Sequence, residues 1–338
     1  MTCRPKRMQQ ICMEKTFIGI DIGKTNMRVG LTTVEPELKF FAKRPYKRGL
    51  PDDVDCQILS AVDEALEKSG APSESLAGIG IGVPAIVNRD DGTILFGPDF
   101  DFLHGHSITK SLKDRYRVPI TADVDTVVAS WGEQWVGMGR TCNRFGLITW
   151  GTSLGAGLIL DGKVYEGPNN LFAEFGHCIV SDDGWPCICG GNGCVATLAS
   201  ASGIVEHGRR ALVQGKDTLL RELAENSPGK VTSAMVFEAA ARGDPVAQQI
   251  LKRVAILLGR LCANLVYTIQ PEKIIIVGGL AERAHSILEM MNSTMRQHCW
   301  LIVKGFTTCE ILPSALGDTA GVLGAIRMIQ QRVIRERT

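Results

Sequence analysis

The sequence predicts an α/β fold of two domains with a cleft between them. Each half of the 338-residue chain opens with a strand, a polar turn that contains glycine, and a second strand, first over residues 16–31 and again over residues 145–160. Both openings continue into segments with helical or strand-like apolar spacing. Because this pattern occurs twice without a low-complexity linker, we expect a duplicated α/β architecture joined by a short hinge.

In the first half, the apolar pattern and the turn residues predict a hairpin, a helix, a strand, a short helix and a last strand. These elements are expected, in that order, over residues 16–31, 54–66, 76–83, 107–116 and 118–121. Ser107 is the predicted N-cap of the short helix, because its hydroxyl can accept a hydrogen bond from a free amide of the first turn. The last strand is expected to deliver the carboxylate of Asp123.

The second half repeats the opening and later holds a long helix and a buried strand. Its hairpin is expected as a strand over residues 145–150, a glycine-rich turn over 151–157 and a strand over 158–160. Apolar residues at helical spacing from Val246 to Leu265 predict the helix, which stops at Pro271. The strand over residues 273–277 then ends in Gly278 and Gly279.

Composition and charge exclude several classes of function. The chain has 37 basic and 36 acidic residues and a net charge of +1, so no overall field favours nucleic acid or a membrane surface. Its first 15 residues are polar and basic and lack the apolar segment of a secretory signal, and no stretch has the length of a membrane span. Eleven cysteines, an odd number, without a signal fit a reducing compartment. We therefore expect a cytoplasmic protein with no nucleic-acid or membrane partner.

Three cysteines and a histidine lie within eighteen residues, at His177, Cys187, Cys189 and Cys194. One histidine and three thiolates form a closed tetrahedral set for structural zinc, and the glycines between the cysteines permit a tight loop. Free thiols are the alternative, and a Cys189–Cys194 disulfide would require an oxidising compartment. We expect zinc that holds a binding loop in shape, with Glu174 three residues before the histidine.

Two glycine-containing turns that follow strands are candidate phosphate-binding loops. Backbone amides of a tight turn bind anions, and threonine and serine hydroxyls add donors. The candidates are Gly23-Lys24-Thr25 in the first half and Gly151-Thr152-Ser153 in the second, and Asp21 is placed to hold Mg²⁺ beside the phosphates. Neither turn matches the Walker or the dinucleotide-binding pattern, and each alone is typical of a plain hairpin. Their recurrence in both halves favours phosphate binding.

Several motifs occur in one order along the chain. They are Asp21-Ile22-Gly23-Lys24-Thr25, Gly151 to Gly157, Glu174-Phe175-Gly176-His177, the cysteine knuckle Cys187 to Cys194, Asn264, Pro271 to Gly279 and Gly317 to Ala325. Together they resemble the ROK family of bacterial sugar kinases and repressors. The resemblance implies a two-domain actin-like ATPase (ribonuclease H-like) fold with ATP and sugar in the interdomain cleft, and a homodimer. It places a small N-terminal domain over residues 16–122, completed by a helix over 319–336. The larger domain covers 123–318 and carries the zinc knuckle over 177–194.

The resemblance also implies a reaction and a set of site residues. An ATP:sugar phosphotransferase of this kind phosphorylates a sugar hydroxyl, usually at C6, and the position that matches its general base is Asp123. Glu174, His177 and Asp99 match sugar-binding positions. The positions that match ATP and phosphate contacts are Asp21, Gly23, Lys24, Thr25, Gly151, Thr152, Ser153, Gly278 and Gly279. The implied cofactors are ATP, Mg²⁺ and structural Zn²⁺.

Some positions depart from the family pattern, mainly at the sugar. Ala122 and Ala196 stand where an asparagine and a sugar-binding glutamate are usual, and Asp99 and Asp125 replace asparagines. The basic residue of the first turn is Lys24, two positions earlier than usual. Because such sites discriminate by hydrogen bonding, these changes leave three alternatives: an unusual hexose, a loosely selective kinase, or a catalytically weak sugar sensor.

A repressor is the main rival function. ROK repressors carry an N-terminal DNA-binding domain, whereas only sixteen residues precede Phe17, too few for such a domain. Arg4, Lys6 and Arg7 are therefore expected in a solvated tail rather than in a DNA-binding arm.

Overall fold

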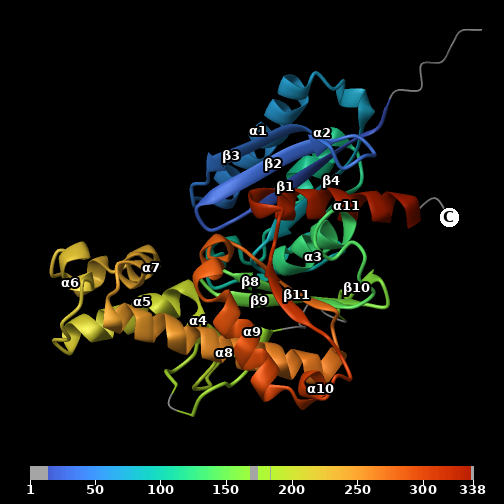
Figure 1. The fold of residues 1–338 in the computed structure, drawn as a ribbon. Helices are drawn as coiled ribbons and strands as arrows, with labels where there is room; N and C mark the ends of the chain where they lie inside the picture. Colours follow the sequence, from blue (N-terminus) through green and yellow to red (C-terminus); the bar gives the residue numbers. More distant parts are fainter. Residues whose placement is uncertain (1–13, 168–173, 183, 336–338) are drawn as a thin grey trace, which may run out of the picture.

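The computed structural model describes residues 14–167, 174–182 and 184–335. The basic N-terminal tail and the last residue of the helix predicted over 319–336 lie outside these ranges. Within them, two five-stranded sheets, with helices between and around them, make up the molecule (Figure 1). The predicted α/β class is confirmed.

The first sheet has the strand order β3-β2-β1-β4-β7. Its strands are β1 (Thr16–Ile22), β2 (Asn26–Thr32), β3 (Leu38–Pro45), β4 (Leu76–Val83) and β7 (Ile120–Val124). β1, β2 and β3 are antiparallel, as the predicted hairpin requires, while β4 and β7 run parallel to β1. Because parallel strands end at the same edge of a sheet, Asp21 of β1 and Val124 of β7 come to one edge.

Two helices and a small hairpin complete the outer side of the first sheet. The helices are α1 (Pro51–Ser69) and α2 (Lys110–Tyr116), and the hairpin strands are β5 (Ile86–Val87) and β6 (Ile94–Phe96). The helix α2 begins after Thr109 rather than after the predicted N-cap Ser107. The hydroxyls of both residues donate to the carbonyl oxygen of Asp91, which keeps this segment in a loop until Lys110.

The second sheet has the strand order β10-β9-β8-β11-β12. Its strands are β8 (Phe145–Trp150), β9 (Leu154–Leu160), β10 (Lys163–Val164), β11 (Lys273–Val277) and β12 (Glu310–Pro313). β8 and β9 form the second predicted hairpin, but β9 begins at Leu154, so Gly155 and Gly157 belong to the strand and not to the turn. The small size of Gly157 serves packing, because a Cβ atom there would lie 2.0 Å from Oγ of Ser130.

Helices cover the outer face of the second sheet. They are α4 (Val195–Ala199), α5 (Ala201–Val213), α6 (Leu220–Leu223), α7 (Ser233–Ala241), α8 (Pro245–Ile269), α9 (Leu288–His298) and α10 (Trp300–Val303). The long predicted helix is α8, where the Asp244 side chain caps the first turn by accepting from the amide of Ala247 at 2.7 Å. None of the helices in the described ranges is both long and apolar enough to cross a membrane.

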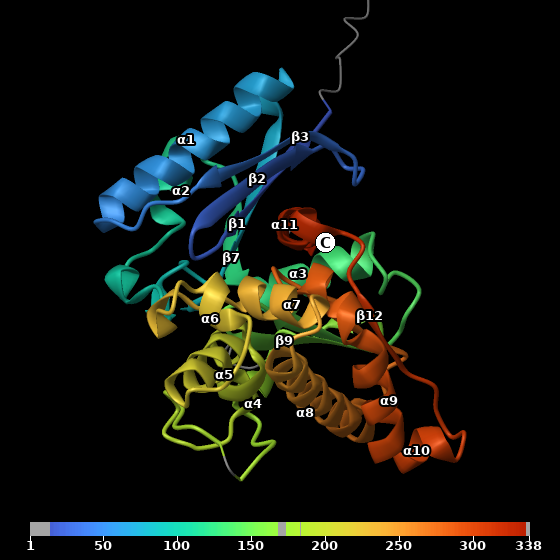
Figure 2. The same cartoon turned by 60° about the vertical axis from the view of Figure 1, so that its left-hand side comes forward.

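Two helices, α3 (Asp125–Trp135) and α11 (Ala320–Arg335), lie side by side between the sheets (Figure 2). α11 packs on β1 and β4 of the first sheet, and α3 packs on β9 of the second. The helix backbones approach closely, because a Cβ atom at Gly324 would lie 1.8 Å from the carbonyl oxygen of Val128, and one at Gly132 would lie 2.5 Å from that of Ala320. The limits of the two domains stay a prediction.

We expect Gly324→Ala to lower the free energy of unfolding by about 3 kcal/mol, because the added methyl group would force α3 and α11 apart. Urea unfolding followed by circular dichroism measures the change. The matched control is Gly229→Ala, since nothing lies within 4 Å of the Cβ position at Gly229. Equal stability of the two variants would contradict the close contact between the helices.

Candidate active site

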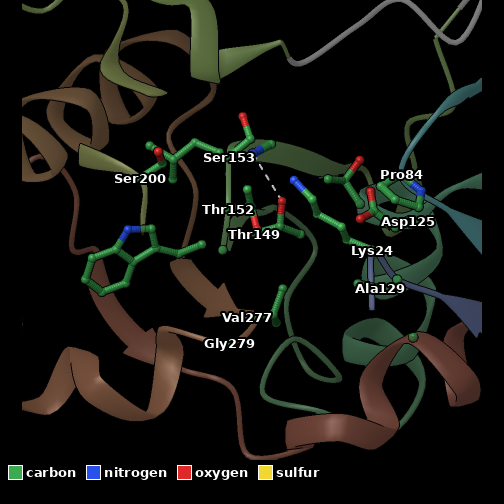
Figure 3. Close-up of a pocket in the computed structure, with 18 of the residues that line it drawn as sticks. Lys24, Pro84, Asp125, Ala129, Thr149, Thr152, Ser153, Ser200, Val277 and Gly279 are labelled. Atoms are coloured by element: carbon green, nitrogen blue, oxygen red, sulfur yellow. Dashed lines mark hydrogen bonds between the residues drawn. The ribbon is translucent and has the colours of Figure 1, made fainter. Parts of the chain in front are cut away.

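A cleft of about 1210 Å³ is lined by residues from both halves of the molecule (Figure 3). One wall comes from the ends of β1 and β7 and the turn after β1, and the other from the β8–β9 turn, the segment after β11 and the cysteine knuckle. The predicted site residues that line the cleft are Asp21, Gly23, Lys24, Thr25, Asp99, Gly151, Thr152, Ser153, Glu174, His177, Cys187, Gly278 and Gly279. Asp123, Cys189 and Cys194, which are also described, lie outside this lining.

The first turn, Gly23-Lys24-Thr25, is anchored to the strands around it. The amide of Gly23 donates to the carbonyl oxygen of Asn26 at 2.8 Å, and the amide of Tyr46 donates to that of Thr25 at 2.9 Å. Lys24 points into the cleft, where its Nζ lies 2.8 Å from a carboxylate oxygen of Asp99 (Figure 3). Arg48 pairs with the same oxygen at 3.1 Å, so a single carboxylate holds two cations at this wall.

The second turn, Gly151-Thr152-Ser153, is anchored to the start of α5. The amide of Ala201 donates to the carbonyl oxygen of Gly151 at 2.9 Å, and the hydroxyl of Ser202 donates to that of Thr152 at 2.9 Å. Across the hairpin, the amide of Gly155 donates to Oγ1 of Thr149 at 3.1 Å (dashed in Figure 3). The turn is therefore held in place at the cleft, as a phosphate-binding turn requires.

Asp21 belongs to a charge network that local sequence patterns did not predict. Arg28 stands opposite Asp21 on β2, with Nη1 at 3.1 Å from the carboxylate. The same guanidinium donates from Nε to Asp318 at 2.8 Å, and Lys43 donates to the other oxygen of Asp318 at 2.8 Å. Burial raises the pKa of Asp21, and Arg28 opposes this effect. The sequence held one indication of this network. Side chains alternate between the two faces of a strand, so Arg28 was expected on the same face of β2 as Asn26, at the end of the strand next to the first turn.

Asp123 is enclosed in the protein instead of facing the cleft. β7 continues to Val124, so Asp123 still lies inside the strand, and it is 0% exposed. Its carboxylate accepts from Nε and Nη2 of Arg89, at 2.8 and 3.3 Å. The last strand of the first half therefore does not bring Asp123 to the lining of the cleft, where we expected it.

Asp125, two residues later, lines the cleft. It is the first residue of α3, after the N-cap residue Val124. Burial, followed by the negative charges of Asp21 and Glu174, raises the pKa of Asp125 to about 7. The sequence could have indicated this position, because an aspartate directly before the apolar residues of a helix is typical of a helix start, and Asp125 precedes the apolar residues of α3.

Glu174 and His177 lie at the ends of a short turn packed on the β8–β9 hairpin. The turn is the 3₁₀ helix η3 (Phe175–His177), and a Cβ atom at Gly176 would lie only 2.2 Å from the carbonyl oxygen of Leu154. Ala196 lines the cleft beside it, 3.4 Å from the same Cβ position. The methyl group of Ala196 offers no polar contact, so Glu174 supplies the carboxylate of this part of the wall.

The candidate zinc ligands converge behind this turn. Their ligand atoms, on His177, Cys187, Cys189 and Cys194, all lie within 4.8 Å of one another. Nδ1 of His177 is 3.3 Å from Sγ of Cys187, and Sγ of Cys189 is 3.5 Å from that of Cys194. Tetrahedral zinc, with ligands at about 2.0–2.3 Å, separates its ligand atoms by roughly 3.5–3.8 Å, so both the donor set and the spacing fit zinc. Binding through Nδ1 leaves Nε2 of His177 available to a ligand in the cleft.

The sequence model of the ROK family matches residues 17–332. The chain belongs to the ROK family. This ROK protein is 30% identical over 319 residues to a glucokinase of Thermotoga maritima, and the aligned region covers 94% of this chain and 98% of that protein. It is 28% identical over 323 residues to a glucokinase of Halalkalibacterium halodurans, over 94% of this chain and 96% of that protein.

A solved structure extends the similarity to three dimensions. The crystal structure of a ROK family glucokinase from Streptomyces griseus in complex with glucose and AMPPNP has a TM-score of 0.79 to this ROK protein. The two are 28% identical, over 94% of this chain and 99% of that chain. The resemblance to the family and the two-domain actin-like ATPase fold are confirmed, and the named relatives agree with the expectation of a hexokinase-type sugar kinase.

We expect the purified protein to contain one zinc ion per chain, measured by inductively coupled plasma mass spectrometry. The double variant Cys189→Ser with Cys194→Ser should lose the metal and melt several degrees lower, because the loop loses its cross-link. Cys56→Ser is the control, since Cys56 is exposed on α1 and lies outside the cluster. A wild-type protein free of zinc, or a double variant that retains it, would contradict the assignment.

Proposed function

We propose that this ROK protein is an ATP-dependent sugar kinase, which transfers the γ-phosphoryl group of ATP to a hydroxyl group, at C6, of a hexose or hexose derivative. The cleft combines two anchored glycine-containing turns with a polar end at Glu174 and His177. The similarity to glucokinases, one of them crystallised with glucose and AMPPNP, supports the same reaction.

The observation that carries the proposal is the carboxylate of Asp125 in the cleft. Asp125 lies within electrostatic reach of Asp21, beside the first turn, and of Glu174, at the sugar end. A carboxylate that lines the cleft can orient the attacking hydroxyl and accept its proton late in a loose transition state. We assign the role of general base to Asp125 rather than to Asp123, because Asp123 is 0% exposed and paired with Arg89.

The nucleotide is assigned to the end of the cleft with the two turns. Amides and hydroxyls of the turns suit phosphate oxygens, and the carboxylate of Asp21 is the kind of oxygen ligand that Mg²⁺ binds directly or through water. Mg²⁺ bound there would neutralise charge on the phosphoryl group. Lys24 and Arg28 line the same wall and add positive charge. Gly278 and Gly279 line the part of the cleft assigned to the adenosine side, and nothing lies within 4 Å of a Cβ atom at Gly279.

The sugar is assigned to the end with Glu174, His177 and Asp99. A carboxylate accepts hydrogen bonds from sugar hydroxyls. In a zinc-bound imidazole the metal occupies one nitrogen and sets the tautomer, so the other nitrogen is left to form a hydrogen bond with the sugar. Ala196 removes a polar partner from this wall, which relaxes the selection for one hydroxyl pattern. We therefore expect activity on hexoses with a changed or substituted position near this wall, beside glucose.

ATP consumption with a panel of hexoses and N-acetylhexosamines tests the proposal. We expect turnover with at least one sugar, and Asp125→Asn should reduce kcat by about 100-fold or more while sugar binding, measured by calorimetry, changes little. Asp114→Asn is the matched control, because Asp114 is exposed on α2 and does not line the cleft. Measurable sugar binding without turnover would instead support a sugar sensor, and near-normal kcat in Asp125→Asn would refute the base.

The pH dependence follows from the environment of Asp125. Burial raises its pKa to about 7, and only the ionised carboxylate accepts a proton. We therefore expect kcat/KM for the sugar to be level above about pH 7 and to fall tenfold per pH unit below it. Initial rates between pH 5.5 and 9 measure the profile. An acid limb near pH 4, where an ordinary aspartate titrates, would contradict the buried environment of the base.

A further inference from the structure

The enclosed pair of Arg89 and Asp123 has no part in the proposed chemistry, yet it lies directly beside the base. Arg89 comes from the loop between β5 and β6 and donates to both oxygens of Asp123, at 2.8 and 3.3 Å. The side chain of Asp123 is 0% exposed and that of Arg89 is 18% exposed. Such two-point pairing fixes the plane of a carboxylate as well as its position.

Asp123, held in this way, is hydrogen-bonded to the backbone at the start of α3. Its Oδ1 accepts from the backbone amide of Val124 at 2.8 Å. Val124 is the N-cap residue of α3, and Asp125 is the first residue of the helix. The pair therefore determines the backbone geometry at the point where β7 ends and the chain turns toward Asp125.

Arg89 also reaches the other half of the molecule. Its Nη1 donates to the carbonyl oxygen of Gly167 at 3.4 Å, and Gly167 follows β10 of the second sheet. Arg89 thus links its own loop, between β5 and β6, to the last strand of the first sheet and to the segment after β10.

Stability alone does not account for such a pair. Removing two charges from water costs about as much as their attraction returns, so buried ion pairs are weak sources of folding free energy. A buried ion pair can instead select one local conformation. Here the conformation selected is that of the strand–helix junction that carries the base.

We propose that Arg89 is a positioning residue of the phosphoryl-transfer site, which holds the start of α3, and with it Asp125, in place through Asp123 and links this junction to the second half of the molecule through Gly167. This inference rests on the proposed function. Since a displacement of about 1 Å at a reacting group can cost roughly 100-fold in rate, loss of Arg89 should reduce kcat by about 10- to 100-fold. KM and the dissociation constant for the sugar should change by less than about threefold, because Arg89 does not line the cleft.

The test compares Arg89→Met, Arg89→Lys, and Arg89→Met combined with Asp123→Ala, with Arg115→Met as control. Arg115 is a half-exposed arginine that pairs with Asp63 on the outer side of the first sheet. Arg89→Met leaves a buried carboxylate without its partner, so it lowers stability as well as rate. The double variant removes that carboxylate and should regain thermal stability, but its kcat should stay low because the junction is no longer held. Arg89→Lys keeps one hydrogen bond and should lie between wild type and Arg89→Met.

Hydrogen exchange separates this inference from the proposed function. Peptides that cover residues 120–130 should exchange faster in Arg89→Met and in the double variant, while peptides from α8 exchange as in wild type. If the wild type turns over no sugar, the proposed function fails, and the exchange at residues 120–130 alone decides the positioning role. A kcat within twofold of wild type in Arg89→Met would overturn the inference. Recovery of kcat in the double variant, or unchanged exchange at the junction, would also overturn it.

Discussion

The close contact between α3 and α11 is the constraint on which the cleft depends. α3 begins with Asp125, and the start of α11 packs against Asp21, because a Cβ atom at Gly321 would lie 2.6 Å from the carboxyl carbon of that residue. Where the two helices cross, Gly132 and Gly324 bring their backbones together, so neither helix can shift without displacing the other. One crossing point therefore fixes the spacing between the carboxylate at the nucleotide end and the carboxylate assigned to the sugar hydroxyl.

Lysine and arginine side chains at the wall that carries the first turn are paired with carboxylates before a ligand binds. Lys24 is held by Asp99, and Arg28 is shared between Asp21 and Asp318. An arriving phosphate group must therefore exchange partners with these carboxylates instead of meeting free cations. The Lys24 pair is well exposed, so it holds the cation weakly and the exchange costs little. Asp125 differs, because burial, followed by the negative charges of Asp21 and Glu174, raises its pKa to about 7.

Local patterns were sufficient for some parts of the site and insufficient for others. The cluster of His177 with three cysteines could be predicted because all four residues lie within eighteen positions, and the two turns because each joins a hairpin. The choice between Asp123 and Asp125 could not be made from apolar spacing. It depends on where β7 ends and on Arg89, 34 residues before its partner. The contact of Arg28 with Asp318 joins residues 290 apart and arises only when α11 packs on the first sheet.

The position of α11 also has a consequence for how the chain acquires its fold. The first sheet is encoded before residue 125, but one of its faces is covered by a helix that follows the whole second sheet in the chain. During synthesis, β1 and β4 leave the ribosome long before α11, so the helix that covers their apolar side chains is missing until the end of the chain has been made. The half of the molecule made first is thus the half completed last. Its folding is tied to the end of translation, and a chaperone that shields strands would have its substrate in the N-terminal sheet.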